Sequence, residues 1–287
     1  MTRIAIIAAM AGELKPLVRG WLHESRNGVD LWRWRYAEGE WIAACAGAGV
    51  DRARQAFAEI ERDGAIDIAV SVGWAGALTE KFAPGKAYRV CGVIDARTGE
   101  RFVAEDSASH PSRKNKDAAR VGHPDSSPVG HPDSSHVRDT DLSQVRAAES
   151  SEVKDPDLWL VTSATVADEA EKQRLVLTYH AGLVDMEAAE VARLAAMRKI
   201  PFHCIKGVSD GFRDKLPDFN RFIAPSGKFQ LFRFIVFAAL RPRYWHPLVR
   251  MGENSRRAAQ SIAESLLDLL DERGQIRKNN GYPNLKY

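Results

Sequence analysis

Short apolar runs alternate with helical patterns along most of this chain, and this alternation constrains the fold more than any other feature. The runs are rich in β-branched residues, whereas residues 50–64 and 188–195 carry apolar side chains at helical spacing. The expected strands are residues 3–10, 31–36, 41–49, 66–78, 86–95, 158–166 and 201–210. Such alternation is typical of a sheet covered by helices on both faces. We therefore predict an α/β fold with a mixed, mainly parallel, twisted sheet flanked by helices.

One long polar segment, at residues 105–156, interrupts this pattern. It contains a tandem copy, VGHPDSS at 121–127 and again at 129–135, whose repeated histidines and aspartates raise the possibility of a metal-binding array. Pro and Ser dominate without an apolar period, so the segment cannot bury enough surface to offset its ordering entropy. We predict a disordered insertion within a single domain at 1–273, followed by a flexible tail at 274–287.

Composition narrows the class of protein. A net charge of +3 on 287 residues is too small to indicate nucleic-acid binding. The three cysteines, Cys45, Cys91 and Cys204, lie far apart without a CxxC pair, which is typical of thiols in a reducing compartment. The first residues do not resemble a secretion signal, and the apolar run at 229–240 is too short to span a bilayer. We expect a cytoplasmic protein with no nucleic-acid partner.

Three acidic residues stand at the ends of strand-like runs. Glu13 follows RIAIIAAM, Glu187 follows LVDM, and Asp210 ends PFHCIKGVSD. Taken singly, each has an ordinary explanation, such as a helix cap or a first-turn acid. Charges in apolar surroundings are costly unless they are paired or used, and ligands of such sheets collect at the carboxyl ends of strands. We therefore expect the three acids to share a ligand site.

Five short motifs carry a family resemblance. They are AAMAGEL (8–14), AGAGVDRA (46–53), VGWAGAL (72–78), VDMEAAEVA (184–192) and KGVSDGF (206–212). In order and spacing they resemble the nucleoside phosphorylase/nucleosidase superfamily, and most closely the 5'-methylthioadenosine/S-adenosylhomocysteine nucleosidases. The resemblance covers 1–104 and 157–240. It implies hydrolysis of the N-glycosidic bond of a 5'-modified purine ribonucleoside and release of adenine, without a metal or cofactor.

The resemblance assigns a separate role to each acid. Asp210 would protonate N7 of the purine as the base leaves, and we expect apolar neighbours to favour its protonated form. Glu13 would activate the attacking water, as the base does in inverting glycosidases. Glu187 would grip the ribose 2'- and 3'-hydroxyls and oppose the growing positive charge on the sugar. Met186 would pack under the sugar.

Further substrate contacts are expected by the same resemblance. Lys206 stands where the family usually has arginine, and it would place a positive charge near the water or Asp210. Trp74 replaces a serine that positions the water, or a phosphate in phosphorylases. The backbone of Val166 would pair with adenine. The remaining expected contacts are Ser209, Ala9 and Phe219.

The nucleophile and the 5'-substituent stay open. Arg52 and Arg54 are possible phosphate ligands, which would make the protein a phosphorylase, but retention of Glu13 and loss of the serine favour water. A futalosine-type nucleoside is an alternative substrate. A non-catalytic nucleoside-binding module is an alternative from another class. Family members usually form dimers or higher oligomers, so we expect this protein to form a homo-oligomer, specifically a dimer.

The C-terminal segment suggests a lipid-linked alternative. Two helices are expected, at 227–240 and about 252–272. The first helix and the segment after it mix aromatic with basic residues and resemble the tail of hopanoid-associated phosphorylase-like proteins. Such a segment could contact a membrane surface or a lipidic substrate through 229–250. Adenosylhopane is therefore a further alternative substrate.

Overall fold

The computed structural model describes residues 2–36, 39–105, 158–214, 217–222, 224 and 230–272. They belong to the unit formed by Met1–Ser109 with Lys154–Tyr287. Apart from Glu105, the insertion predicted at 105–156 and the tail predicted at 274–287 lie outside the described residues. The metal-binding array considered for the tandem repeat lies outside them as well.

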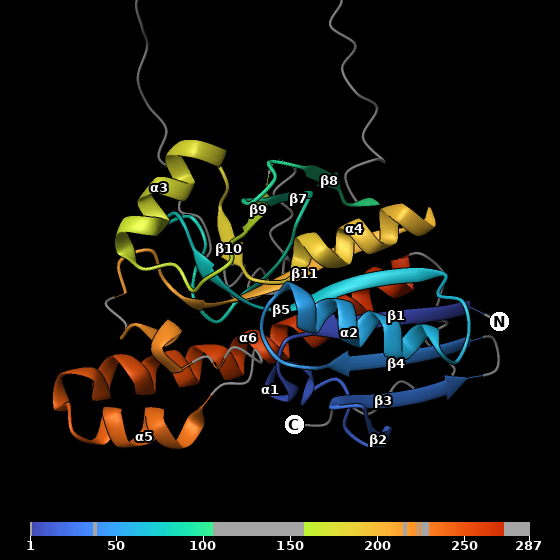
Figure 1. Cartoon of the computed structure of the whole chain (residues 1–287), viewed down its shortest axis with the longest axis horizontal. Coiled ribbons are helices and arrows are strands. Elements are labelled where there is room, and N and C mark those ends of the chain that lie inside the picture. The colour runs from blue at the N-terminus through green and yellow to red at the C-terminus, as the bar shows by residue number, and fades with distance from the viewer. Residues whose placement is uncertain are drawn as a thin grey trace, which may run out of the picture. The chain divides into compact units, whose positions relative to one another are not determined.

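Eleven strands form one mixed sheet in the described part of the chain (Figure 1). They are β1 (Thr2–Ala8), β2 (Leu22–Arg26), β3 (Val29–Tyr36), β4 (Gly39–Cys45), β5 (Ile68–Ala77), β6 (Ala87–Arg89), β7 (Gly92–Asp95), β8 (Arg101–Val103), β9 (Trp159–Thr162), β10 (Leu183–Asp185) and β11 (Phe202–Asp210). The order is β2-β3-β4-β1-β5-β10-β9-β7-β8, and β11 pairs with β5 and β6. Strands β4, β1, β5 and β11 are joined by parallel ladders. The predicted α/β fold with a mixed sheet is confirmed.

Helices cover both faces of this sheet (Figure 1). On one face lie α2 (Val50–Glu61) and α4 (Ala188–Arg198), whose apolar side chains share a core with that face. On the other face lie α1 (Ala11–Leu14) and the long α6 (Trp245–Glu272). The remaining helices are α3 (Glu169–Tyr179), η3 (Phe219–Phe222), α5 (Leu231–Ala239) and η4 (Pro242–Tyr244).

Three elements differ from the sequence-based expectation in ways that bear on the fold. The strand predicted at 86–95 is two strands, because the backbone changes partner between them: Val90 N–H donates to Cys204 O, and Cys91 N–H donates to Leu158 O. Helix α3 was not expected, although Asp168 caps it by accepting a hydrogen bond from Glu171 N–H. The last helix begins at Trp245 rather than near residue 252.

A β-bulge shapes the end of the central strand β11. Along the parallel ladder with β5, Val208 lies opposite Ala75 and Asp210 opposite Gly76, so Ser209 is the extra residue. A bulge of this kind bends the strand and redirects side chains. The side chains of Ser209 and Asp210 both belong to the wall of the cavity described below.

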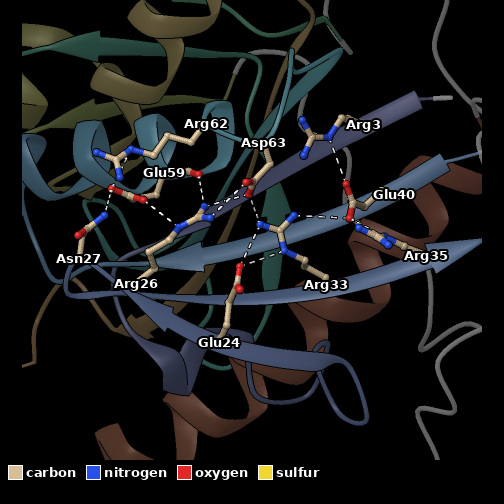
Figure 2. A network of polar contacts seen from close by, with 10 residues as sticks. All are labelled: Arg3, Glu24, Arg26, Asn27, Arg33, Arg35, Glu40, Glu59, Arg62 and Asp63. Carbon is tan, nitrogen blue, oxygen red and sulfur yellow. Dashed lines mark hydrogen bonds and ion pairs between the residues drawn. The ribbon is translucent and has the colours of Figure 1, made fainter.

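A polar network ties the edge hairpin to the sheet and α2 (Figure 2). The buried carboxylate of Glu40 accepts hydrogen bonds from Arg3 and Arg35. The buried carboxylate of Glu59 accepts one from Arg26. Buried charges are tolerated when they are paired and hydrogen-bonded in this way. The network thus fixes β2 and β3, which the sequence pattern only partly indicated, onto β4 and α2.

Candidate active site

One cavity of about 1020 Å³ opens at the carboxyl ends of the central strands. Residues that follow β1, β4 and β10 line it, together with the last residues of β11 and the carboxyl-terminal part of β5. Helices α1, α3, α5 and α6 and the short η3 complete the wall. This is the edge at which an α/β sheet binds its ligands. The cavity brings together nine predicted site residues: Ala9, Glu13, Trp74, Val166, Met186, Glu187, Ser209, Asp210 and Phe219.

Glu13 lies on α1, one turn beyond the end of β1, and its side chain is buried. Its Oε2 accepts hydrogen bonds from Ala9 N–H and Met10 N–H, both at 2.9 Å, and its Oε1 accepts one from Trp74 N–H at 2.9 Å. Gly73 makes room for it, because a Cβ there would meet both carboxylate oxygens at 3.1 Å. Burial raises the pKa of Glu13, although the backbone amides oppose the shift.

Glu187 is the N-cap residue of α4, and only Met186 separates it from the end of β10. Its Oε1 accepts a hydrogen bond of 2.7 Å from Gly49 N–H, at the start of α2. Gly49 has φ of 99°, a conformation that favours glycine. Burial and the nearby carboxylate of Asp185 raise the pKa of Glu187 to about 8. The raised pKa favours the protonated carboxyl of Glu187 in the free protein.

Lys206, expected near the water or Asp210, does not line the cavity. It is buried on β11, and its Nζ lies 2.9 Å from Asp185 Oδ2 and 3.0 Å from Ser71 Oγ. Burial alone would lower the pKa of Lys206, but the carboxylate of Asp185 outweighs it and the pKa is raised. The charge of Lys206 still acts on the site from behind, because it lowers the pKa of Glu13 and of Glu187.

Asp210 has polar partners rather than the apolar surroundings expected from sequence. Its Oδ2 lies 2.5 Å from Nζ of Lys172 in an ion pair, and its Oδ1 accepts a hydrogen bond of 2.7 Å from Ser209 Oγ. The apolar residues of β11 that flank Asp210 in sequence point mostly into the core. Lys172 was not predicted as a site residue. The spacing of apolar residues after it could have indicated its position. Leu175, Val176 and Tyr179 follow Lys172 by three, four and seven residues, so Lys172 shares the inward face of α3 with them.

The backbone of Val166, expected to pair with adenine, already has a partner. Val166 N–H donates to Asn220 Oδ1 at 2.8 Å, and Asn220 Nδ2 donates to Val166 O at 2.9 Å. Asn220 lies in η3, and the carboxamide presents an acceptor and a donor side by side, like the N1–N6 edge of adenine. Pairing of the base with Val166 therefore requires that Asn220 move away.

Trp74 forms part of the wall beside Glu13. Its indole Nε1 donates to Ser255 O of α6 at 2.9 Å, and its ring packs so closely on Gly12 that a Cβ there would lie 3.1 Å from it. The indole thus links β5, α1 and α6 across the cavity. It occupies this wall where the resembling family has a small serine.

The two candidate phosphate ligands are not in the cavity wall. Arg54 is hydrogen-bonded to Glu190 and Asp51, and Arg52 Nη1 donates to Gln55. The cationic side chains that the described residues contribute to the wall are Lys15, Lys172 and Arg256. No group of His, Cys, Asp and Glu side chains suited to a metal ion is found among the described residues. None of the helices described is long and apolar enough for a membrane span.

Comparison with known proteins agrees with the architecture. No curated protein matches the chain by sequence. Futalosine hydrolase of Helicobacter pylori superposes with a TM-score of 0.60 at 14% identity, over 94% of this chain and 98% of that one. The Arabidopsis thaliana 5'-methylthioadenosine nucleosidase gives 0.62 at 14% identity, over 96% and 98%. The Campylobacter jejuni 5'-methylthioadenosine/S-adenosyl homocysteine nucleosidase gives 0.59 at 15% identity, over 95% and 100%.

These identities are low, so the superpositions establish a shared fold. The family model described as the phosphorylase superfamily matches residues 3–229, which is most of the chain. Together with the fold, this match shows that the chain belongs to the phosphorylase superfamily.

Proposed function

We propose that the protein hydrolyses the N-glycosidic bond of a purine ribonucleoside and releases the base. The observation that carries the proposal is that Glu13, Glu187 and Asp210 line one cavity although they lie far apart in sequence. Membership of the phosphorylase superfamily and the shared fold with nucleosidases support it. The base is a purine, with adenine as the first candidate.

Glu13 takes the proton of the attacking water. Its Oε1 accepts one hydrogen bond from a backbone amide, which leaves a lone pair for water. The three amide donors fix the carboxylate in place, so no reorganisation is needed as it becomes basic. Water attacks C1' from the side opposite the base, as in inverting glycosidases.

Glu187 binds the ribose hydroxyls, and Met186 packs under the sugar. Glu187 lies between the start of α2 and the start of α4, and it is held by Gly49 N–H. As the sugar becomes oxocarbenium-like, its positive charge favours the ionised form of Glu187, whose pKa is about 8 in the free protein. The interaction is therefore stronger in the transition state than with the bound substrate.

Asp210 donates a proton to N7 of the leaving base. A purine anion is a poor leaving group, and general acid assistance contributes about 10²–10⁴-fold. Ser209 orients the carboxyl through its hydrogen bond to Oδ1.

Water is the favoured nucleophile over phosphate. A phosphorylase needs a cluster of arginines and amides for a dianion. Arg54 is committed to Glu190 and Asp51, outside the cavity wall. The backbone amides near β1 and β5 are committed to Glu13. Phosphate would have to displace that carboxylate.

The cavity favours a substrate larger than a simple nucleoside. Its volume of about 1020 Å³ lies at the upper end of the usual range for a small ligand, about 300–1,000 Å³. The wall also carries large apolar side chains, among them Phe234, Leu248 and Met251. A nucleoside with a large apolar 5'-substituent, of the adenosylhopane type, is therefore the second candidate beside 5'-methylthioadenosine and S-adenosylhomocysteine.

The neighbouring surface suits access of such a substrate from a lipid phase. Exposed large apolar side chains lie on α5, just after it and on α6: Val236, Leu240, Trp245 and Val249. They lie in the same segment as Phe234 and Leu248 of the cavity wall. We further propose that this segment contacts a membrane surface. We also propose that the protein assembles as a homodimer.

The test is product analysis on a panel of 5'-modified adenosines, with and without phosphate. We expect free base and free sugar without phosphate. The Asp210→Asn variant should lose at least about 10²-fold in kcat and remain folded, whereas the exposed control Asp51→Asn should retain the wild-type rate. Strict phosphate dependence would indicate a phosphorylase. Tight nucleoside binding without turnover of any substrate would indicate a binding module instead.

A further inference from the structure

We infer that Lys172 supplies, through Asp210, the proton that the departing base takes up. The inference rests on the proposed function, which makes Asp210 the group that contacts the base. Lys172 Nζ lies 2.5 Å from Asp210 Oδ2 and donates a second hydrogen bond of 2.9 Å to Gly211 O. Both Lys172 and Asp210 belong to the wall of the substrate cavity.

The fold makes specific room for this pair. Lys172 lies on α3, its side chain is 5% exposed, and that of Asp210 is 13% exposed. A Cβ on Gly76 would meet Asp210 Oδ2 at 3.2 Å and Lys172 Cε at 3.4 Å. The absence of a side chain at Gly76 therefore permits the contact.

An anchoring role alone does not account for the position of the pair. A buried ion pair that merely joined α3 to β11 would add little stability, because apolar residues of similar volume usually serve as well. This pair is placed at the cavity wall, on the residue expected to meet the base. Its location indicates chemistry rather than packing.

Protonation follows from the same geometry. Both oxygens of Asp210 accept hydrogen bonds, one from an ammonium and one from Ser209 Oγ. In an ion pair the carboxylate carries no proton of its own to donate. The nearest transferable proton is on Lys172 Nζ, one hydrogen bond away.

As the C1'–N9 bond breaks, its electron pair moves into the purine, and N7 takes a proton from Asp210, which takes one from Lys172. The oxygen of water forms the new bond to C1', and Glu13 takes the water proton. Lys172 has then lost one proton and Glu13 has gained one, and exchange with solvent in the cavity restores both. Lys172 acts through Asp210, so it is a positioning residue that also provides the proton.

The experiment measures kcat and KM for three ribosides whose leaving groups depend differently on protonation. They are the nucleosides of adenine and 6-chloropurine and the riboside of 4-nitrophenol, which leaves readily as an anion. In Lys172→Met we expect kcat for the adenine nucleoside to fall by about 10²–10⁴-fold with little change in KM. The loss should shrink for 6-chloropurine and nearly vanish for 4-nitrophenol.

Lys172→Arg separates proton supply from charge, and it also serves if the methionine variant does not fold. Arginine keeps the positive charge but does not give up a proton. We expect it to remain slow with adenine and fast with 4-nitrophenol. The matched control is Lys199→Met, which removes an exposed lysine at the end of α4, outside the cavity wall, and should leave all three rates unchanged.

Three results would overturn the inference. They are a wild-type rate for Lys172→Arg with adenine, an equal loss for all three leaving groups in the variants, or no loss in Lys172→Met. A wild-type protein that releases no base from any riboside would instead refute the proposed function itself.

Discussion

Replacing Glu187 by glutamine should stabilise the protein against unfolding at alkaline pH while removing its activity. Burial and the carboxylate of Asp185 raise the pKa of Glu187 from 4.5 to about 8. Below pH 4.5 the group is protonated in both the folded and the unfolded chain, so it does not affect the folding equilibrium there. As pH rises toward about 8, the unfolded chain ionises first, and the free energy of unfolding of the wild type falls.

The magnitude follows from this shift. Each unit of pKa difference corresponds to about 1.4 kcal/mol. Across the interval from 4.5 to about 8 the wild type loses at most about 5 kcal/mol of stability through this one group. Glutamine has no proton to lose, and its carbonyl can still accept the hydrogen bond from Gly49 N–H. The variant is therefore nearly as stable as wild type at pH 4.5 and more stable at pH 8.

The assay is urea unfolding of both proteins at several values between pH 4.5 and pH 8.5. We expect the free energy of unfolding of Glu187→Gln to exceed that of the wild type by an amount that grows with pH. The difference should reach at least about 2 kcal/mol and at most about 5 kcal/mol. Glu253→Gln, an exposed position on α6, is the control and should show no such trend. A difference between Glu187→Gln and wild type that is constant with pH would refute the reasoning.

Two further predictions test the base site and the edge network. Asn220→Ala frees the N–H and C=O of Val166. Because the base no longer competes with the Asn220 carboxamide for these groups, KM should fall by about tenfold. A higher KM would mean that Asn220 itself binds the base. A hydrogen bond from Arg26 lowers the pKa of Asp63 to about 2, so the wild type should lose stability as pH falls from 3.8 toward 2, whereas Asp63→Asn should not. Urea unfolding at pH 2.5 and pH 5 measures this difference.

The acids could be found from sequence because their signal is local. Glu13, Glu187 and Asp210 each follow an apolar strand, and the carboxyl ends of such strands meet at one edge of the sheet. The order of the family motifs then gave each acid a role. The same reasoning predicted the mixed sheet and the helices on its two faces.

The partners of the acids could not be found in this way, because they are set by tertiary contacts. Lys172 reaches Asp210 across 38 residues, and Asn220 reaches Val166 across 54. Neither contact produces a recognisable pattern in the sequence, because the partners lie far apart along the chain. Strict alternation along β11 would put Lys206 and Asp210, four residues apart, on one face of the strand. The bulge at Ser209 breaks this alternation, and Lys206 Nζ contacts Asp185 instead.

On the proposed mechanism, the distribution of charge in the cavity is suited to the transition state more than to the substrate. The two ammonium groups of Lys172 and Lys206 are each paired with an aspartate. Glu13 and Glu187 accept hydrogen bonds from backbone amides, and burial raises the pKa of both. The free site therefore has buried carboxyl groups whose ionised forms need positive charge nearby. An oxocarbenium-like sugar supplies that charge only while the glycosidic bond is breaking, so the interaction lowers the barrier rather than tightening substrate binding.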